Sequence, residues 1–199
     1  MAHKFKYGEK EESLLESVIH LTSLRERDSL EISLVTTLNW MIQPRKITLY
    51  KIQFHQGVQE VVAEVVIDGG RLVVNLEDDD PDAVVRLDSR AGFVECQDTR
   101  KALASTFPCG GNACYGHVFP VLGNRDAIVG FFEVICEHFD ESDYKLISGF
   151  LEIYHNYLTI IDDSQRDTLT GLLNRKTFDN NIAKIIEIQQ YQDNPDKKT

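Results

Sequence analysis

The chain opens with two stretches in which hydrophobic residues recur every three or four positions, the spacing of an amphipathic helix. In the first stretch, one side of the helix carries Leu14, Val18 and Leu21. In the second stretch, one side carries Leu30, Leu34, Leu38 and Met41. Pro44 follows, and proline cannot continue a helix. We therefore expect two helices before the first strand.

The second helix is preceded by a possible start signal. Asp28 and Glu31 are spaced as in a capping box, in which the first side chain accepts a backbone amide hydrogen bond and the second reaches back. This pattern predicts that the helix begins at Asp28.

After the second helix the hydrophobic period shortens to two, which is the period of a β-strand. The alternation predicts a strand over Ile47–Phe54, and β-branched residues predict another over Val58–Ile67. Gly57 and the sequence Asp68-Gly69-Gly70 are typical of hairpin turns. We therefore expect an antiparallel meander that continues into a third strand over Arg71–Val74.

The second half of the chain has a less regular pattern. We expect Asp88–Gly116 to be irregular, with a short helix near Thr99–Ser105. Strands are predicted over His117–Leu122 and Ile128–Cys136. Two helices, then antiparallel strands, then a closing helix indicate the α+β class rather than alternating βαβ units.

The closing helix is predicted over 141–161, because its hydrophobic residues form two neighbouring rows. One row, spaced alternately four and three residues apart, consists of Leu146, Phe150, Ile153, Tyr157 and Ile160. This spacing keeps a seam facing a partner helix, so we predict a parallel homodimer through this row. The second row would cover the chain's own sheet. The alternative is that both rows pack within one chain.

Composition and charge exclude several classes of function. The chain has 199 residues, of which 42% are hydrophobic and 27% charged, as in ordinary globular proteins. Its net charge of -11 would repel nucleic-acid phosphates and anionic lipids, so we expect neither nucleic acid nor membrane as a partner. Four cysteines are too few for a disulfide framework. We therefore expect a cytoplasmic protein.

Three residues with metal-binding or redox chemistry gather in the middle of the chain. Cys109, Cys114 and His117 lie close together in sequence, and Cys96 precedes them. Thiolates and an imidazole can hold zinc or iron, but this spacing is not a standard zinc pattern, so we assign no metal. These four residues are candidates for ligand binding or redox chemistry. The remaining alternative is that the thiols are only structural.

Residues 167–175 resemble the motif Asp-x-Leu-Thr-Gly-Leu-x-Asn-Arg that opens GGDEF domains. The matching residues are Asp167, Leu169, Thr170, Gly171, Leu172, Asn174 and Arg175. In the family these positions are structural, and the parent enzyme joins two GTP molecules into cyclic di-GMP with the help of Mg²⁺. The catalytic Gly-Gly-Asp/Glu-Glu-Phe hairpin is not found in this sequence. The resemblance therefore implies a GGDEF domain cut off before its active site, with no catalytic residue in this chain.

The part before this motif resembles a GAF sensor domain, with a PAS fold as the alternative. The resemblance implies an N-terminal helix over 1–27, a GAF-like domain over 28–161 with its signalling helix at the end, and a linker plus truncated GGDEF start over 162–199. It implies a regulatory region of a diguanylate cyclase that senses an unidentified small molecule. The alternatives are a thiol enzyme that reduces free methionine sulfoxide and a ligand-free dimerisation module.

Overall fold

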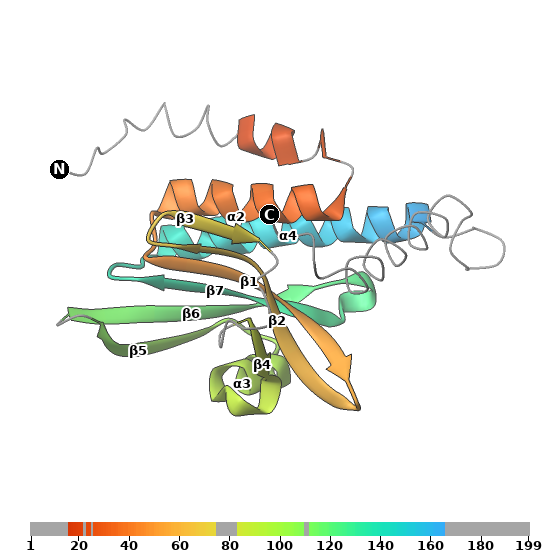
Figure 1. Cartoon of the computed structure of the whole chain (residues 1–199). Helices are drawn as coiled ribbons and strands as arrows, with labels where there is room; N and C mark the ends of the chain where they lie inside the picture. The colour runs from red at the N-terminus through yellow and green to blue at the C-terminus, as the bar shows by residue number, and fades with distance from the viewer. Residues whose placement is uncertain (1–15, 22, 25, 75–82, 110–111, 166–199) are drawn as a thin grey trace, which may run out of the picture. The chain divides into compact units, whose positions relative to one another are not determined.

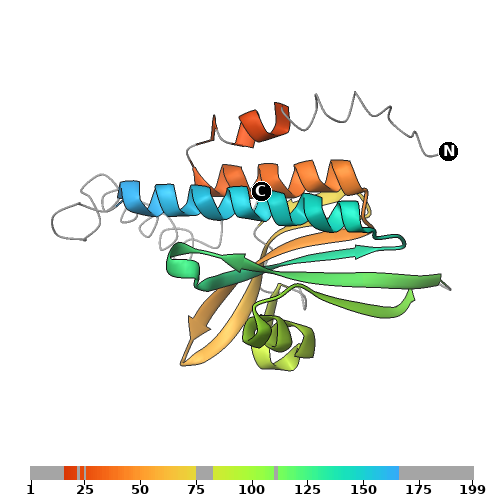
Figure 2. The same ribbon diagram turned by 180° about the vertical axis from the view of Figure 1, so that it is seen from behind.

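The computed structural model describes residues 16–21, 23–24, 26–74, 83–109 and 112–165. The fold class is α+β, as the sequence predicts: an antiparallel sheet has helices on both of its faces (Figures 1 and 2). The strands are β1 Lys46–His55, β2 Val58–Asp68, β3 Arg71–Val74, β4 Val84–Arg86, β5 Leu103–Cys109, β6 Asn112–Leu122 and β7 Ile128–Cys136. Their spatial order is β3-β2-β1-β7-β6-β5, with β4 paired to β2.

The helices divide between the two faces of the sheet. Figure 1 shows α2 and α4 side by side on one face and α3 on the other. Their bounds are α2 Arg27–Ile42, α3 Ala91–Thr99 and α4 Glu141–Gln165. Short 3₁₀ turns cover Leu87–Ser89 and Asn124–Asp126. No helix in the described ranges is long and apolar enough to cross a membrane.

The larger hydrophobic core lies between the sheet and the pair α2 and α4. Leu49, Phe132 and Phe119 lie opposite one another on β1, β7 and β6, so they form one row across three strands. All three belong to this core, and each has at most 2% of its surface exposed. The hydrophobic face of α2 and Ile147 and Tyr154 of α4 pack against this row. Burial of these apolar faces is what holds the two helices on the sheet.

A smaller core lies on the opposite face, beneath α3. The rings of Phe93 and Phe131 stack with centroids 4.7 Å apart, and Tyr50 meets Phe93 edge-on at 5.2 Å. Cys96 is completely buried in the same cluster. Aromatic side chains therefore fill the layer between α3 and the sheet.

Glycines fix two features of the central strands. Gly57, Gly69 and Gly70 have φ values of 82°, 54° and 84°, the left-handed region that hairpin turns require, which confirms the predicted turns. On β7, a Cβ added at Gly130 would lie 2.0 Å from the carbonyl oxygen of Tyr50. Only glycine therefore allows β7 to approach β1 this closely.

The predicted capping box is wrong. Helix α2 begins at Arg27, with Glu26 in the N-cap position and no side-chain cap hydrogen bond. The carboxylate of Glu31 does not accept the backbone amide hydrogen bond of a capping box, and it pairs with the side chains of Arg27 and Lys51 instead. The end of this helix near Pro44 is confirmed, since α2 stops at Ile42.

The prediction of an irregular stretch over Asp88–Gly116 is also wrong. The helix in this stretch is α3, which ends where the predicted helix near Thr99–Ser105 was to begin. Strand β5 occupies the rest and pairs with β6, which itself starts five residues before the predicted strand. As an edge strand, β5 contains a proline and exposed polar residues, so it lacks the alternation that marks a half-buried strand.

The chain divides into two units, Met1–Leu158 and Thr159–Thr199. The second unit begins within the last turns of α4 and contains the motif Asp167–Arg175, which lies outside the described residues. Of the first unit's N-terminal part, residues 16–21 are helical, and Leu21 is buried in the larger core.

Candidate functional site

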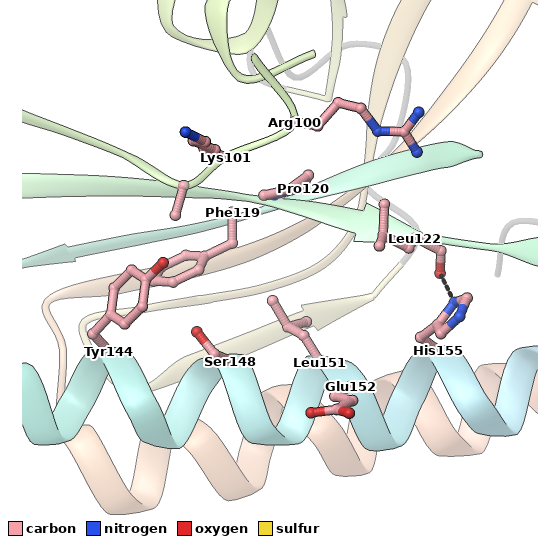
Figure 3. A pocket seen from close by; sticks show the side chains of 11 residues that line it. Arg100, Lys101, Phe119, Pro120, Leu122, Tyr144, Ser148, Leu151, Glu152 and His155 are labelled. Atoms are coloured by element: carbon pink, nitrogen blue, oxygen red, sulfur yellow. Dashed lines mark hydrogen bonds between the residues drawn. The ribbon is translucent and has the colours of Figure 1, made fainter. Parts of the chain in front are cut away.

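An open groove of about 420 Å³ runs between α4 and strand β6 (Figure 3). One wall comes from α4, and the other comes from β6 and the segment that follows α3. The lining residues are Arg100, Lys101, Ala102, Phe119, Pro120, Leu122, Tyr144, Ser148, Leu151, Glu152 and His155. The spacing of the α4 residues by three or four positions places them on one side of that helix.

The groove has an apolar lining. The rings of Phe119 and Tyr144 lie 5.4 Å apart at the N-terminal part of α4. Leu151 is buried, and Pro120 and Leu122 come from β6. Tyr144 still has 44% of its surface exposed, which shows that the groove is open to solvent at this end.

Four polar side chains border this apolar surface without partners in the described part of the chain. The ammonium group of Lys101 and the carboxylate of Glu152 form no ion pair there, and the hydroxyls of Tyr144 and Ser148 form no hydrogen bond. In Figure 3, Glu152 lies on α4 and Lys101 on the opposite wall. Since polar groups beside apolar surface gain most when a ligand pairs with them, these four groups are available for recognition.

The other end of the groove is closed by a polar cluster. Arg100 donates a hydrogen bond to the backbone carbonyl of Asp126. The imidazole of His155 lies between two oxygens, with Nδ1 3.2 Å from the carbonyl of Leu122 and Nε2 3.6 Å from the Asp126 carboxylate. These contacts join α4 to the turn after β6 and to the end of α3.

A buried carboxylate connects α4 to α2 and to the sheet. Glu31 of α2 is only 2% exposed, and it pairs with Arg27 at 2.9 Å and with Lys51 of β1 at 2.9 Å. Tyr154 of α4 donates a hydrogen bond of 2.7 Å to the same carboxylate. Burial and the nearby Glu31 charge raise the pKa of Tyr154 well above its usual value, so the phenol remains a donor.

A second polar cluster lies on the face covered by α3. The hydroxyl of Tyr50 donates to Glu133 at 3.1 Å and accepts from Arg90 at 3.2 Å. The guanidinium of Arg90 also lies 3.6 Å from Glu133 and over the ring of Phe93. Burial is the main cause that raises the pKa of Tyr50. Because these groups satisfy one another beside the packed aromatic rings, the cluster fixes the position of α3.

Within the described part of the chain, the structure does not bring the candidate residues from the sequence together into one site. Cys96 is buried on α3, with its sulfur 3.8 Å from the carbonyl oxygen of Val118. Cys114 is buried on β6. His117, three residues later on the same strand, stacks its ring on Phe139 on the face covered by α2 and α4, with the ring centroids 3.6 Å apart. The described residues contain no group of three metal-binding side chains.

The fourth candidate is placed only by its backbone. Cys109 ends β5 opposite Asn112, and Cys114 lies opposite Phe107, so the two cysteines are diagonal neighbours in one hairpin. The side chain of Cys109 lies outside the described part of the chain. A shared role of these cysteines stays a prediction.

Burial makes the thiols of Cys96 and Cys136 poor nucleophiles. It raises the pKa of Cys96 to about 11, and it is the main cause that raises the pKa of Cys136 to about 11. Burial also lowers the pKa of His117, so its imidazole is neutral at pH 7. Reactive thiols have the opposite shift, because the thiolate is the nucleophile.

Comparison with solved structures shows which fold this is. A putative GAF sensor protein from Burkholderia vietnamiensis matches with a TM-score of 0.53 and 13% identity, over 79% of this chain and 92% of that one. The chain has the fold of a GAF domain. This GAF fold is also similar to free methionine-R-sulfoxide reductase from Neisseria meningitidis, with a TM-score of 0.58 and 12% identity, over 79% and 93% of the two chains. A segment of a methyl-accepting chemotaxis protein matches with a TM-score of 0.56 and 12% identity, over 75% and 98%.

No protein-family model and no curated protein sequence matches this chain. The structural similarities, at 12–13% identity, therefore establish the fold and favour GAF over the PAS alternative.

Sequence reasoning did not find the groove. Its polar residues Lys101, Tyr144, Ser148 and Glu152 belong to no motif, and each is an ordinary residue type for a helix surface or a loop. The only sequence signal was that Tyr144 and Ser148 lie beside the second hydrophobic row of the closing helix, on the side away from the first row.

Proposed function

We propose that this GAF domain is the sensor region of a diguanylate cyclase, and that α4 carries its signal. The observation that carries this proposal is the length and position of α4. The helix packs against the sensor core through Ile147 and Tyr154, forms one wall of the groove, and extends to Gln165. The motif that resembles the start of a GGDEF domain begins two residues later, at Asp167.

The proposed mechanism is a change in the position of α4. A ligand that contacts this helix shifts it relative to α2 and β1, which hold it through Tyr154 and Glu31. In a parallel homodimer, the two copies of α4 would present two GGDEF domains to each other. Each of those domains would bind one GTP with Mg²⁺, so their relative placement would set the rate of cyclic di-GMP formation.

A chimera tests this proposal. The catalytic part of a characterised diguanylate cyclase is joined at the position that matches Arg175, and cyclic di-GMP formation from GTP and Mg²⁺ is measured. We expect the chimera to be active and to differ in rate from the isolated catalytic part, because the sensor imposes a dimer geometry. We expect no product from the present chain alone, which lacks the catalytic hairpin. Equal rates for the chimera and the isolated catalytic part would contradict the proposal.

A second candidate is a thiol-dependent reductase of free methionine sulfoxide, which the similarity to the Neisseria enzyme favours. The raised pKa of Cys96 argues against this candidate, because a buried neutral thiol is a poor nucleophile. A direct assay of sulfoxide reduction with a thiol reductant distinguishes the two. Turnover that is lost in Cys109→Ser or Cys114→Ser would establish the enzyme.

A further inference from the structure

We propose that the groove beside α4 binds a small organic monocarboxylate with an apolar body. The groove's volume of about 420 Å³ falls within the range of roughly 300–1,000 Å³ that is typical of small-molecule sites. Its surface combines apolar side chains with a few polar groups at the border, which is the usual composition of such sites.

The apolar body of the ligand fits the lining of the groove. Tyr144 offers an exposed ring, and the buried ring of Phe119, with its centroid 5.4 Å away, and Leu151 of α4 form the floor beneath it. An aromatic or branched aliphatic group placed here would cover the exposed part of Tyr144. The gain from removing this surface from water is roughly 25 cal/mol per Å².

The charge of the ligand follows from the opposite wall. Lys101 is exposed, and within the described ranges its ammonium group forms no ion pair. A carboxylate that reaches Lys101 while the apolar body occupies the groove forms a charge-assisted hydrogen bond. The hydroxyls of Tyr144 and Ser148 can donate further hydrogen bonds to the carboxylate or to a polar substituent.

Glu152 limits the ligand to a single negative charge. This carboxylate belongs to α4, lies at the border of the groove, and has no cationic partner among the described residues. A second carboxylate or a phosphate on the ligand would be repelled by Glu152, and like-charge contacts of this kind give specificity against the wrong ligand. The groove therefore selects monocarboxylates over dicarboxylates and phosphates.

This site is separate from the layer under α3, where Phe93 and Phe131 stack and fill the space. A ligand in the groove would contact both α4 and the segment after α3, and thus could alter the position of the helix. This regulatory consequence rests on the proposed function, but ligand binding itself does not.

Calorimetric titration of this chain with 3-phenylpropionate tests the site. We expect saturable binding with one ligand per chain, and affinity about tenfold weaker for neutral 3-phenylpropanamide, which cannot pair with Lys101. Inorganic phosphate should not bind. NMR shift changes should include Ala102, Leu122 and Ser148, and they should spare Phe93.

Four variants separate the parts of the proposal. Lys101→Gln should weaken 3-phenylpropionate about tenfold and remove its advantage over the amide. The matched control is Lys145→Gln, since Lys145 is on α4, pairs with Glu141 and does not line the groove. Ser148→Trp should block binding by filling the groove. Glu152→Gln should allow phenylsuccinate to bind, because the repelling charge is gone.

Three results would overturn the proposal: no binding of 3-phenylpropionate at millimolar concentration, equal effects of Lys101→Gln and Lys145→Gln, or NMR shifts centred on Phe93. Thermal unfolding of each variant verifies that it is folded. The cyclase chimera distinguishes the two proposals: binding without a change in cyclic di-GMP formation would leave the site intact and contradict only its regulatory role.

Discussion

At the scale of single residues, the tertiary contacts of Glu31 give this side chain a role that its position in the sequence does not predict. In sequence it resembles the last residue of a capping box, but its carboxylate is 2% exposed and lies among Arg27, Lys51 and Tyr154. A buried charge is tolerated only when it is paired and hydrogen-bonded. Two cations and one phenol provide these partners, so the residue joins α2, β1 and α4.

Replacing this carboxylate should therefore be costly. We expect Glu31→Gln to lower the free energy of unfolding by about 2 kcal/mol, since the neutral amide loses the charge-assisted contacts with Arg27 and Lys51, although Lys51 keeps its pair with Glu64. Urea unfolding measures the change. Asp88→Asn is the control, because its ion pair with Arg86 is on the surface and should contribute little. Equal effects of the two substitutions would show that the buried network does not stabilise the fold.

The thiols allow a second prediction at this scale. Burial raises the pKa of Cys96 to about 11, so at pH 8 the thiol is protonated as well as covered. We expect native protein to react with a thiol reagent at Cys96 at least about a hundredfold more slowly than unfolded protein, because only the thiolate attacks. Mass spectrometry after timed labelling identifies the modified cysteine. Rapid labelling of Cys96 in the native state would favour the redox candidate.

At the scale of elements, α4 buries more of its surface within its own chain than the sequence predicts. Phe150 is 3% exposed within the larger core, and Leu146 and Tyr157 pack against that core. The Tyr157 hydroxyl donates a hydrogen bond to the carbonyl of Leu24. Ile160 is 62% exposed and Ile153 is partly exposed, so a dimer seam would depend mainly on these two residues.

The homodimer remains a prediction, and these two residues test it. Ile153→Asp combined with Ile160→Asp should convert a dimer into a monomer in sedimentation experiments, because a charge in an apolar seam is costly to bury. The circular dichroism spectrum should be unchanged, since neither side chain is in the core. Glu152→Gln, on a neighbouring position of the helix, is the control and should leave the dimer intact. Unaltered protein that is monomeric at high concentration would contradict the seam.

At the scale of the whole molecule, the proposed route from sensor to output depends on the rotation of α4 about its axis. Each residue of a helix turns the chain by about 100°. In the cyclase chimera, two alanines inserted after Ile161 should turn the output by about 200° and change cyclic di-GMP formation at least severalfold. Seven inserted residues nearly restore the original orientation, and they should have a much smaller effect. Equal rates in both variants would indicate that the rotation of α4 does not reach the output domain through a continuous helix.

The sequence by itself determined the elements whose hydrophobic period is strong. Strand β7 has the predicted bounds, the turns at Gly57 and Gly69-Gly70 are where glycine places them, and α4 begins at the predicted residue. These features depend on neighbouring residues, because strand alternation, helical rows and positive φ values are local properties. The α+β class followed from their order along the chain.

Only the tertiary structure decided the rest. Edge strand β5 and helix α3 have no clear period of their own, and pairing with β6 and packing of Phe93 on Phe131 define them. The groove has Lys101 and Glu152 in its two walls from positions fifty-one residues apart, and Glu31 pairs with Lys51 and accepts a hydrogen bond from Tyr154 only because β1 and α4 approach it. Contacts between distant segments leave no periodic trace in the sequence, because they depend on how helices and strands pack rather than on how they form.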